Sequence, residues 1–225
     1  MRSLILFVAA CSSTSPPPPA KPAPEEHAHA DHQGGMHHRF ENANEWAKVF
    51  DDPARDEWQQ PDRVIEALAL TPAMTVADIG AGTGYFSVRL ARAVPKGSVI
   101  ATDIEADMVR YMTDCATHEG IANMHAQLTP PEDPQLAASS LDRILVVDVW
   151  HHLGDRRAYA AKLAAGLRPG GMIAIVDFKL DATRGPPAKH RLPADAIAAD
   201  LAAAGLATEV SSIELPDQYI VIGKR

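Results

Sequence analysis

Apolar positions along this chain follow two different spacings from about residue 40 onward. Continuous apolar runs occur at 76–79, where Asp78 is the exception, at 144–147 and at 172–176, and the segments between them repeat their apolar positions every three to four residues. Strands that are apolar on both faces are typical of parallel sheets covered by helices on both sides. The pattern therefore predicts strands that alternate with helices.

The boundaries follow from the same pattern. We expect strands over 75–79, 98–103, 123–128, 142–149 and 172–178, and helices over 42–50, 62–70, 85–94, 106–116, 156–167 and 194–205. "RPGG" at 168–171 predicts a turn. Two alternating segments, 208–215 and 218–225, predict an antiparallel hairpin at the sheet edge. The predicted fold class is α/β: a doubly wound, Rossmann-like, mainly parallel sheet with an antiparallel edge strand and helices on both faces.

Three glycines interrupt this pattern directly after the first strand. Gly80, Gly82 and Gly84 lie within "DIGAGTGYF" at 78–86. Glycine permits a tight turn and a close ligand, and the helix that follows begins with free N–H groups. About twenty residues later Asp103 ends the second strand, where acidic side chains meet ribose hydroxyls in nucleoside-binding folds. Together these residues predict a nucleoside-containing ligand.

The glycine spacing separates two nucleoside-binding classes. A dinucleotide fingerprint G-x-G-x-x-G that starts at Gly80 needs a third glycine at position 85, where this chain has Tyr85. The pattern is D-x-G-x-G-x-G from Asp78. This difference, with the lack of a second recognisable substrate domain in the sequence, disfavours a nicotinamide oxidoreductase.

Four segments resemble the motifs of class I S-adenosylmethionine-dependent methyltransferases. They are "VADIGAGTGYFSVRLA", "VIATDIEADMV", "LDRILVVDVWHHL" and "LAAGLRPGGMIAIVDF". The resemblance runs from about Phe40 to Arg225, and "WAKVFDDPARDEWQQPDRVI" is similar to the lead-in of a bacterial subgroup, many of whose members carry export signals. It implies that S-adenosylmethionine is the cofactor and that the chain is a methyltransferase.

The resemblance also implies roles by position. Gly80 and its neighbours face the methionine part of the cofactor, Asp78 holds its amino end, Asp103 takes the ribose hydroxyls and Ile104 lies beside the adenine. The third motif departs from the family, because "AQLTPPEDP" offers only Gln127 or Thr129 where an Asp or Asn often holds the adenine amine. The predicted cofactor-binding residues are Asp78, Gly80, Ala81, Gly82, Gly84, Asp103, Ile104 and Asp148.

Candidates for catalysis lie just after the fourth predicted strand. Methyl transfer from a sulfonium is an in-line displacement, for which the protein supplies alignment, a water-poor site and sometimes a base. Asp148 can orient a substrate, and His151 or His152 can remove a proton from an oxygen or nitrogen nucleophile. The alternative is that Asp148 caps the loop and one histidine has a packing role.

Four further residues have two interpretations each. Trp46 and Trp58 either form a lid over the cofactor or pack in the core. His190 and Arg191 either meet the substrate or belong to a solvated loop.

The N-terminal residues predict export and a tether. Arg2 precedes a short apolar run from Leu4 to Ala10, and "VAAC" resembles a bacterial lipobox that ends at Cys11. We therefore expect a signal peptide and lipobox over 1–11, a Pro- and His-rich linker over 12–38 and the methyltransferase domain over 39–225. This organisation predicts a membrane-anchored lipoprotein that faces the periplasm or the cell exterior. A miscalled start, with Met36 as one candidate true start, is the alternative and implies a cytoplasmic protein.

The linker contains a tract of histidines, and imidazole is a common metal ligand. The tract has no cysteine and is flanked by Gly and Ala, so we favour a solvated linker and predict no metal site. A non-catalytic, membrane-tethered module that binds a cofactor or metal is the alternative to an enzyme. The histidines are His27, His29, His32, His37 and His38.

The net charge limits the classes of molecule that can be the methyl acceptor. The formal net charge is −8 and no dense Lys/Arg stripe is present, which disfavours nucleic acid as a partner. No insertion is large enough for a separate recognition domain. We therefore expect a small-molecule acceptor, which the sequence does not identify.

Overall fold

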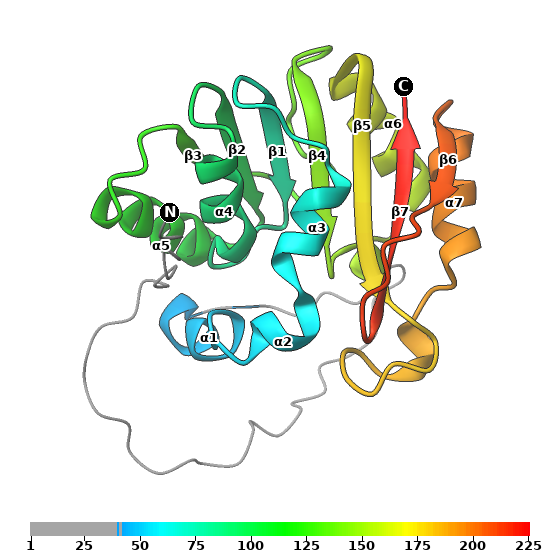
Figure 1. The fold of residues 1–225 in the computed structure, drawn as a ribbon, viewed down its shortest axis with the longest axis horizontal. Helices are drawn as coiled ribbons and strands as arrows, with labels where there is room; N and C mark the ends of the chain where they lie inside the picture. Colours follow the sequence, from blue (N-terminus) through cyan, green and yellow to red (C-terminus); the bar gives the residue numbers. More distant parts are fainter. Residues whose placement is uncertain (1–39, 41) are drawn as a thin grey trace, which may run out of the picture.

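The computed structural model describes residues 40 and 42–225, and within them a mixed sheet forms the centre of the molecule (Figure 1). The strand order is β3-β2-β1-β4-β5-β7-β6, and β1 to β5 are parallel. β7 runs antiparallel to both β5 and β6. The strands are β1 (Thr75–Ile79), β2 (Ser98–Asp103), β3 (Met124–Leu128), β4 (Leu141–Val147), β5 (Leu167–Phe178), β6 (Ala207–Val210) and β7 (Gln218–Lys224). The predicted fold class and the antiparallel pair at the sheet edge are confirmed.

Helices cover both faces of the sheet because successive strand residues point to opposite sides. Val76 and Leu145 pack with α3, α4 and α5 in one core, and Ala77 and Ile144 pack with α6 and α7 in the other. The helices are α1 (Ala43–Phe50), α2 (Arg55–Gln59), α3 (Pro61–Ala67), α4 (Tyr85–Ala93), α5 (Ala106–His118), α6 (Arg156–Gly166) and α7 (Ala194–Ala203), with short 3-10 turns η1 (Trp150–His152) and η2 (Ala188–His190).

The first two helices lie across the carboxyl ends of the strands. In Figure 1, α1 and α2 lie below the sheet, at the end to which the arrowheads of β1 and β5 point. The segment that follows β5 reaches the same end of the sheet. In open α/β sheets, ligands bind at this end, so the lead-in helices form one wall of any site there.

Most element ends lie within three residues of the sequence prediction, and three features differ from it more strongly. A separate helix, α2, is present between the two expected lead-in helices. β5 already begins at Leu167, because Gly170 N–H donates to Arg225 O (3.2 Å) and Arg225 N–H donates to Gly171 O (3.0 Å), so the C-terminus pairs with the expected turn. β6 ends at Val210, because Ile213 N–H donates to Ser211 Oγ (3.2 Å) and not to a neighbouring strand.

The predicted signal, lipobox and linker, Cys11 and the histidine tract all lie outside the described residues. Within residues 42–225 no helix has the length and apolar character needed to cross a bilayer.

Candidate active site

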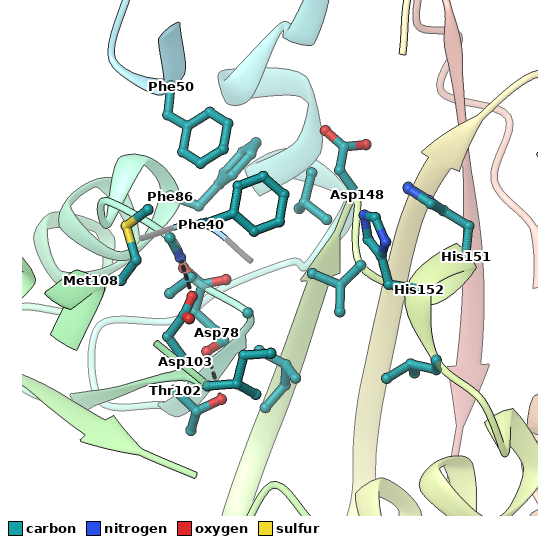
Figure 2. A pocket seen from close by; sticks show the side chains of 18 of the residues that line it. Phe40, Phe50, Asp78, Phe86, Thr102, Asp103, Met108, Asp148, His151 and His152 are labelled. Carbon is teal, nitrogen blue, oxygen red and sulfur yellow. Dashed lines mark hydrogen bonds between the residues drawn. The ribbon is translucent and has the colours of Figure 1, made fainter. Parts of the chain in front are cut away.

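A cavity of about 1220 Å³ opens at the carboxyl ends of the parallel strands. Its walls come from the ends of β1, β2, β4 and β5, from α1 and α2, and from the segment 184–187. Figure 2 shows Asp78, Thr102, Asp103 and Met108 on one side, and Asp148, His151 and His152 on the other. Pockets for one small ligand typically occupy roughly 300–1,000 Å³, so this cavity has room for two.

The glycine turn forms the floor of the first side. Gly80 and Gly82 adopt left-handed φ angles of 67° and 58°, which glycine adopts without strain. A Cβ added at Gly80 would lie 2.4 Å from Val149 Cγ2, so the turn packs closely against the residue after Asp148. Ala81 N–H donates to Thr102 O (2.9 Å), which fixes the turn against β2.

Asp103 is fixed beside this turn. Gly82 N–H donates to one carboxyl oxygen (2.8 Å) and Glu105 N–H donates to the other (2.9 Å). Burial raises the pKa of Asp103, and the two N–H donors oppose that rise. The carboxyl group is therefore held in one orientation at the cavity wall, as recognition of vicinal hydroxyls requires.

Asp78 lies one strand residue before the turn and is buried. The Ser87 hydroxyl on α4 donates to its Oδ2 (2.6 Å). Burial raises the pKa of Asp78 to about 6, while the Ser87 hydrogen bond and the charge of Arg55 lower it. A positively charged group placed in the cavity near Asp78 would further favour the ionised carboxylate.

Side chains of α1 and α2 and of the loop between them contact residues at the end of the glycine turn. Asp51 at the end of α1 accepts hydrogen bonds from the hydroxyls of Thr83 (2.7 Å) and Tyr111 (3.3 Å). The Arg55 guanidinium lies over the Tyr85 ring, 4.0 Å from its centroid. The Tyr85 hydroxyl donates to Asp56 on α2. These contacts close the cavity on the side opposite the sheet.

Asp148 follows β4 with a left-handed φ of 60°, a conformation that is strained for a residue with a side chain and recurs at functional sites. Its Oδ1 accepts a hydrogen bond from Gln218 Nε2 on β7. Gln59 Nε2 on α2 donates to Gln218, and Arg55 in turn donates to Gln59 Oε1 (3.1–3.2 Å). This polar chain links α2, β7 and the end of β4.

Burial raises the pKa of Asp148 to about 7, and the negative charge of Asp177 adds to that rise. The charges of Arg55 and His151 and the Gln218 hydrogen bond oppose it. Asp148 therefore exchanges its proton near neutral pH, in the range where a group can act as acid or base.

We expect Asp148→Asn to gain stability relative to the wild type as pH rises. A raised pKa means that the native state binds this proton more tightly than the unfolded chain, where the pKa is about 3.9. That native advantage is present below about pH 4 and is lost as pH rises toward 7, whereas asparagine does not titrate. Urea unfolding of both proteins between pH 5 and 8 measures the difference. A pH-independent difference would contradict the raised pKa.

His151 and His152 lie in η1, directly after Asp148, and both line the cavity. Their ring centroids are 4.2 Å apart. His151 Nδ1 lies 2.9 Å from Asp177 Oδ1, and the His151 side chain is 3% exposed. Phe40 contacts His152 edge to face. The two histidines therefore have different environments, and only His151 pairs with Asp177.

Comparisons with known proteins agree with this geometry. Residues 76–171 match the family model described as a methyltransferase domain. The matched residues include the glycine turn, Asp103, Asp148 and both histidines. Residues 76–171 form a methyltransferase domain.

Relatives with this domain include an uncharacterized methyltransferase of Mycobacterium bovis, 30% identical over 117 residues. That alignment covers 52% of this chain and 57% of the relative, so the chain spans little more than half the length of the curated mycobacterial relatives it matches. Malonyl-[acyl-carrier protein] O-methyltransferase of Hahella chejuensis is 31% identical over 98 residues, which cover 44% of this chain and 34% of that protein.

Solved structures extend the likeness beyond the methyltransferase domain. A SAM-dependent methyltransferase from Aquifex aeolicus superimposes with a TM-score of 0.74 at 26% identity, and the match covers 81% of this chain and 98% of that one. The YcgJ protein of Bacillus subtilis, at 16% identity and a TM-score of 0.61, shares the fold over 74% of this chain and 98% of its own.

Most of the residues predicted from the sequence line the cavity of the methyltransferase domain. They are Asp78, Gly80, Ala81, Gly82, Asp103, Ile104, Asp148, His151 and His152. Gly84 does not line it; with a φ of 90° it begins α4 and packs near Met112. Of the two adenine-contact candidates, Thr129 lines the cavity and Gln127 does not.

Both predicted tryptophans line the cavity, Trp46 stacked on Phe50 and Trp58 stacked on Phe178. His190 and Arg191 do not line it. Arg191 instead donates to carbonyl oxygens of its own loop, such as Ala182 O (2.7 Å). The basic residue of this loop that lines the cavity is Arg184, together with residues 185–187.

Sequence reasoning also missed Asp177, Arg55, Gln59 and Gln218. A signal for Asp177 is present, because it is the acidic residue that ends the apolar run 172–176 at the carboxyl edge of the sheet. The other three act through contacts between segments far apart in the chain, since Gln59 donates to Gln218 and Arg55 lies over the Tyr85 ring. Within the described part of the chain, no group of three or more His, Cys, Asp or Glu side chains is arranged to hold a metal ion.

Proposed function

We propose that this protein is a methyltransferase that uses S-adenosylmethionine and acts on a small-molecule acceptor. The observation that carries the proposal is the continuous cavity, in which the glycine turn and Asp103 lie on one side and Asp148 and His151 on the other. The family match of residues 76–171 and the likeness to the Aquifex aeolicus enzyme support the same reaction.

The residues on the first side fit S-adenosylmethionine. Gly80 and Gly82 leave backbone surface where side chains would otherwise project, and Phe50 lies 3.5 Å from the position of a Cβ at Gly82. Asp103 would accept hydrogen bonds from the ribose hydroxyls, and Ile104 and Thr129 would form the walls of the adenine site. The carboxyl group of Asp78 would face the amino end of the methionine part.

S-adenosylmethionine supplies an activated methyl group on a positively charged sulfur. The protein's own contribution is alignment of the acceptor and exclusion of water. Aromatic side chains from α1 and α2 cover the cavity, and Asp51 and Arg55 hold these helices in place. The carboxyl groups of Asp78 and Asp148 add negative potential near a bound cation.

Methyl-labelled S-adenosylmethionine tests the reaction. Purified protein is incubated with the labelled compound and a host metabolite extract, and labelled products are compared with a sample that lacks the protein. The proposal requires a labelled small molecule and an equal amount of S-adenosylhomocysteine. Binding of S-adenosylmethionine without transfer to any extract component would instead favour a non-catalytic cofactor-binding module.

We also propose that the domain is tethered to a membrane through lipidated Cys11, with residues 12–38 as the spacer. "VAAC" and the apolar run before it support this proposal. We expect labelled palmitate to be incorporated in the native host and to be lost in Cys11→Ala. Label retained in Cys11→Ala would contradict lipidation at Cys11, and absence of label in the wild type would favour the cytoplasmic alternative.

A further inference from the structure

His151 is held in a defined orientation by Asp177. Asp177 is completely buried, and its Oδ1 also accepts a hydrogen bond from Phe178 N–H (2.8 Å). A carboxylate can only accept, so His151 Nδ1 carries the proton in their 2.9 Å hydrogen bond. The lone pair of the neutral ring is then on Nε2, on a residue that lines the cavity.

The second oxygen of Asp177 has an unusual environment. Asp177 Oδ2 is buried and has no hydrogen-bond partner among the residues that the structure describes. An unpaired buried oxygen is costly and calls for a physical explanation. Among the described residues only Oδ1 accepts hydrogen bonds, so the negative charge on Oδ2 remains available to stabilise a positive charge that forms on the adjacent imidazole.

Aromatic rings from α2 and from the end of β5 line the same cavity as His151. Phe178, the next residue after Asp177, stacks on Trp58 with 6.0 Å between ring centroids. The Arg184 guanidinium lies 5.1 Å from the Trp58 ring centroid, and Pro186 lines the same region. Flat apolar surfaces of this kind favour a ligand with an aromatic ring.

We propose that His151 is the general base of methyl transfer, that Asp177 positions it, and that the acceptor is a hydroxyl on an aromatic ring. This inference rests on the proposed methyltransferase function. A hydroxyl must lose its proton to give a neutral ether, and a base that lines the same cavity as these rings meets that need. Amines attack through a neutral lone pair and do not require a base before attack.

The reaction balances without any further reagent. The acceptor oxygen forms a bond to the methyl carbon, and the electrons of the broken carbon–sulfur bond stay on sulfur, which becomes neutral. The acceptor's proton moves to Nε2 of His151. The imidazolium that results lies beside the Asp177 carboxylate and returns its proton to solvent after product release.

Binding of a chromogenic phenol tests the base without any cofactor. When 4-nitrophenol is added to the wild type at fixed pH, we expect the phenolate absorbance to exceed that of the free compound at the same pH. His151→Asn keeps a donor for Asp177 but removes Nε2, and it should lose this increase. His118→Asn, an exposed histidine on α5, is the matched control and should behave as the wild type.

Turnover with S-adenosylmethionine and 4-nitrophenol gives the second readout. We expect kcat for 4-nitroanisole formation to fall about 100-fold or more in His151→Asn, and roughly tenfold or more in Asp177→Asn. In both variants, KM for 4-nitrophenol and the affinity for S-adenosylmethionine should change little, which a general loss of structure would not produce. 4-nitroaniline, which lacks the hydroxyl, should not be methylated.

Three results would overturn the inference. The first is failure of the wild type to bind 4-nitrophenol at millimolar concentration. The second is a phenolate increase that persists in His151→Asn. The third is a loss of 4-nitroanisole formation in His152→Asn or Asp148→Asn while His151→Asn stays active. If S-adenosylmethionine itself does not bind, the proposed function fails, and the cofactor-free titration still reports on His151 separately.

Discussion

Asp103→Ala is expected to weaken S-adenosylmethionine binding by about 100-fold or more. Hydrogen bonds to a charged group contribute roughly 1.5–3 kcal/mol each, and a fixed carboxylate can accept two from the ribose hydroxyls. Each 1.4 kcal/mol corresponds to tenfold in the dissociation constant. The substitution also leaves the N–H groups of Gly82 and Glu105 without their acceptor, so the glycine turn loses an anchor.

Isothermal titration calorimetry measures this loss, and two variants separate its causes. Asp103→Asn retains an acceptor for one of the two N–H groups but removes the charge, so it should bind more tightly than Asp103→Ala and more weakly than the wild type. Asp114→Ala, which removes an exposed carboxylate on α5, should bind as the wild type does. If folded Asp103→Ala bound S-adenosylmethionine with an affinity within twofold of the wild type, Asp103 would not be the residue that binds the ribose.

Trp150→Ala should lower the free energy of unfolding by about 3–5 kcal/mol. Trp150 is completely buried between the sheet and α7, and its indole N–H donates to Asp200 Oδ2 (3.3 Å). The substitution leaves a large cavity next to His151 in η1, while Asp200 Oδ2 keeps its hydrogen bond from Arg156 Nε (3.1 Å). Loss of packing there should therefore also disorder the proposed base.

Urea denaturation of Trp150→Ala checks the stability effect. Val210→Ala, at a 53% exposed position on β6, is the control and should change stability by less than about 0.5 kcal/mol. A decrease of less than about 1 kcal/mol in the free energy of unfolding of Trp150→Ala would contradict the packing of η1 against the core that the sheet forms with α6 and α7.

The sequence predicted the sheet and the cofactor side of the cavity because both depend on local signals. Strands β1, β4 and β5 each contain a run of mainly apolar residues without alternation, at 76–79, 144–147 and 172–176, which identifies them as covered on both faces. The glycine turn and Asp103 lie at strand ends that a parallel sheet brings to one edge. Local residue spacing therefore indicated which end of the sheet carries the cavity.

The opposite side of the cavity depends on contacts that sequence spacing does not encode. Gln59 and Gln218 are 159 residues apart, yet their side chains share a hydrogen bond that leads to Asp148. Sequence analysis considered Arg191 and not Arg184 as a residue that meets the substrate, although both are basic residues of one loop. Only the packing of that loop, in which Arg184 pairs with Asp217 and lies over Trp58, distinguishes them.

The most direct measurement is calorimetric titration of the folded wild-type protein with S-adenosylmethionine and with S-adenosylhomocysteine. The account predicts that both compounds bind at one site per chain and compete with each other, and that Asp103→Ala weakens both. A stable, folded protein that gives no heat of binding with either compound, at concentrations up to the millimolar range, would contradict it.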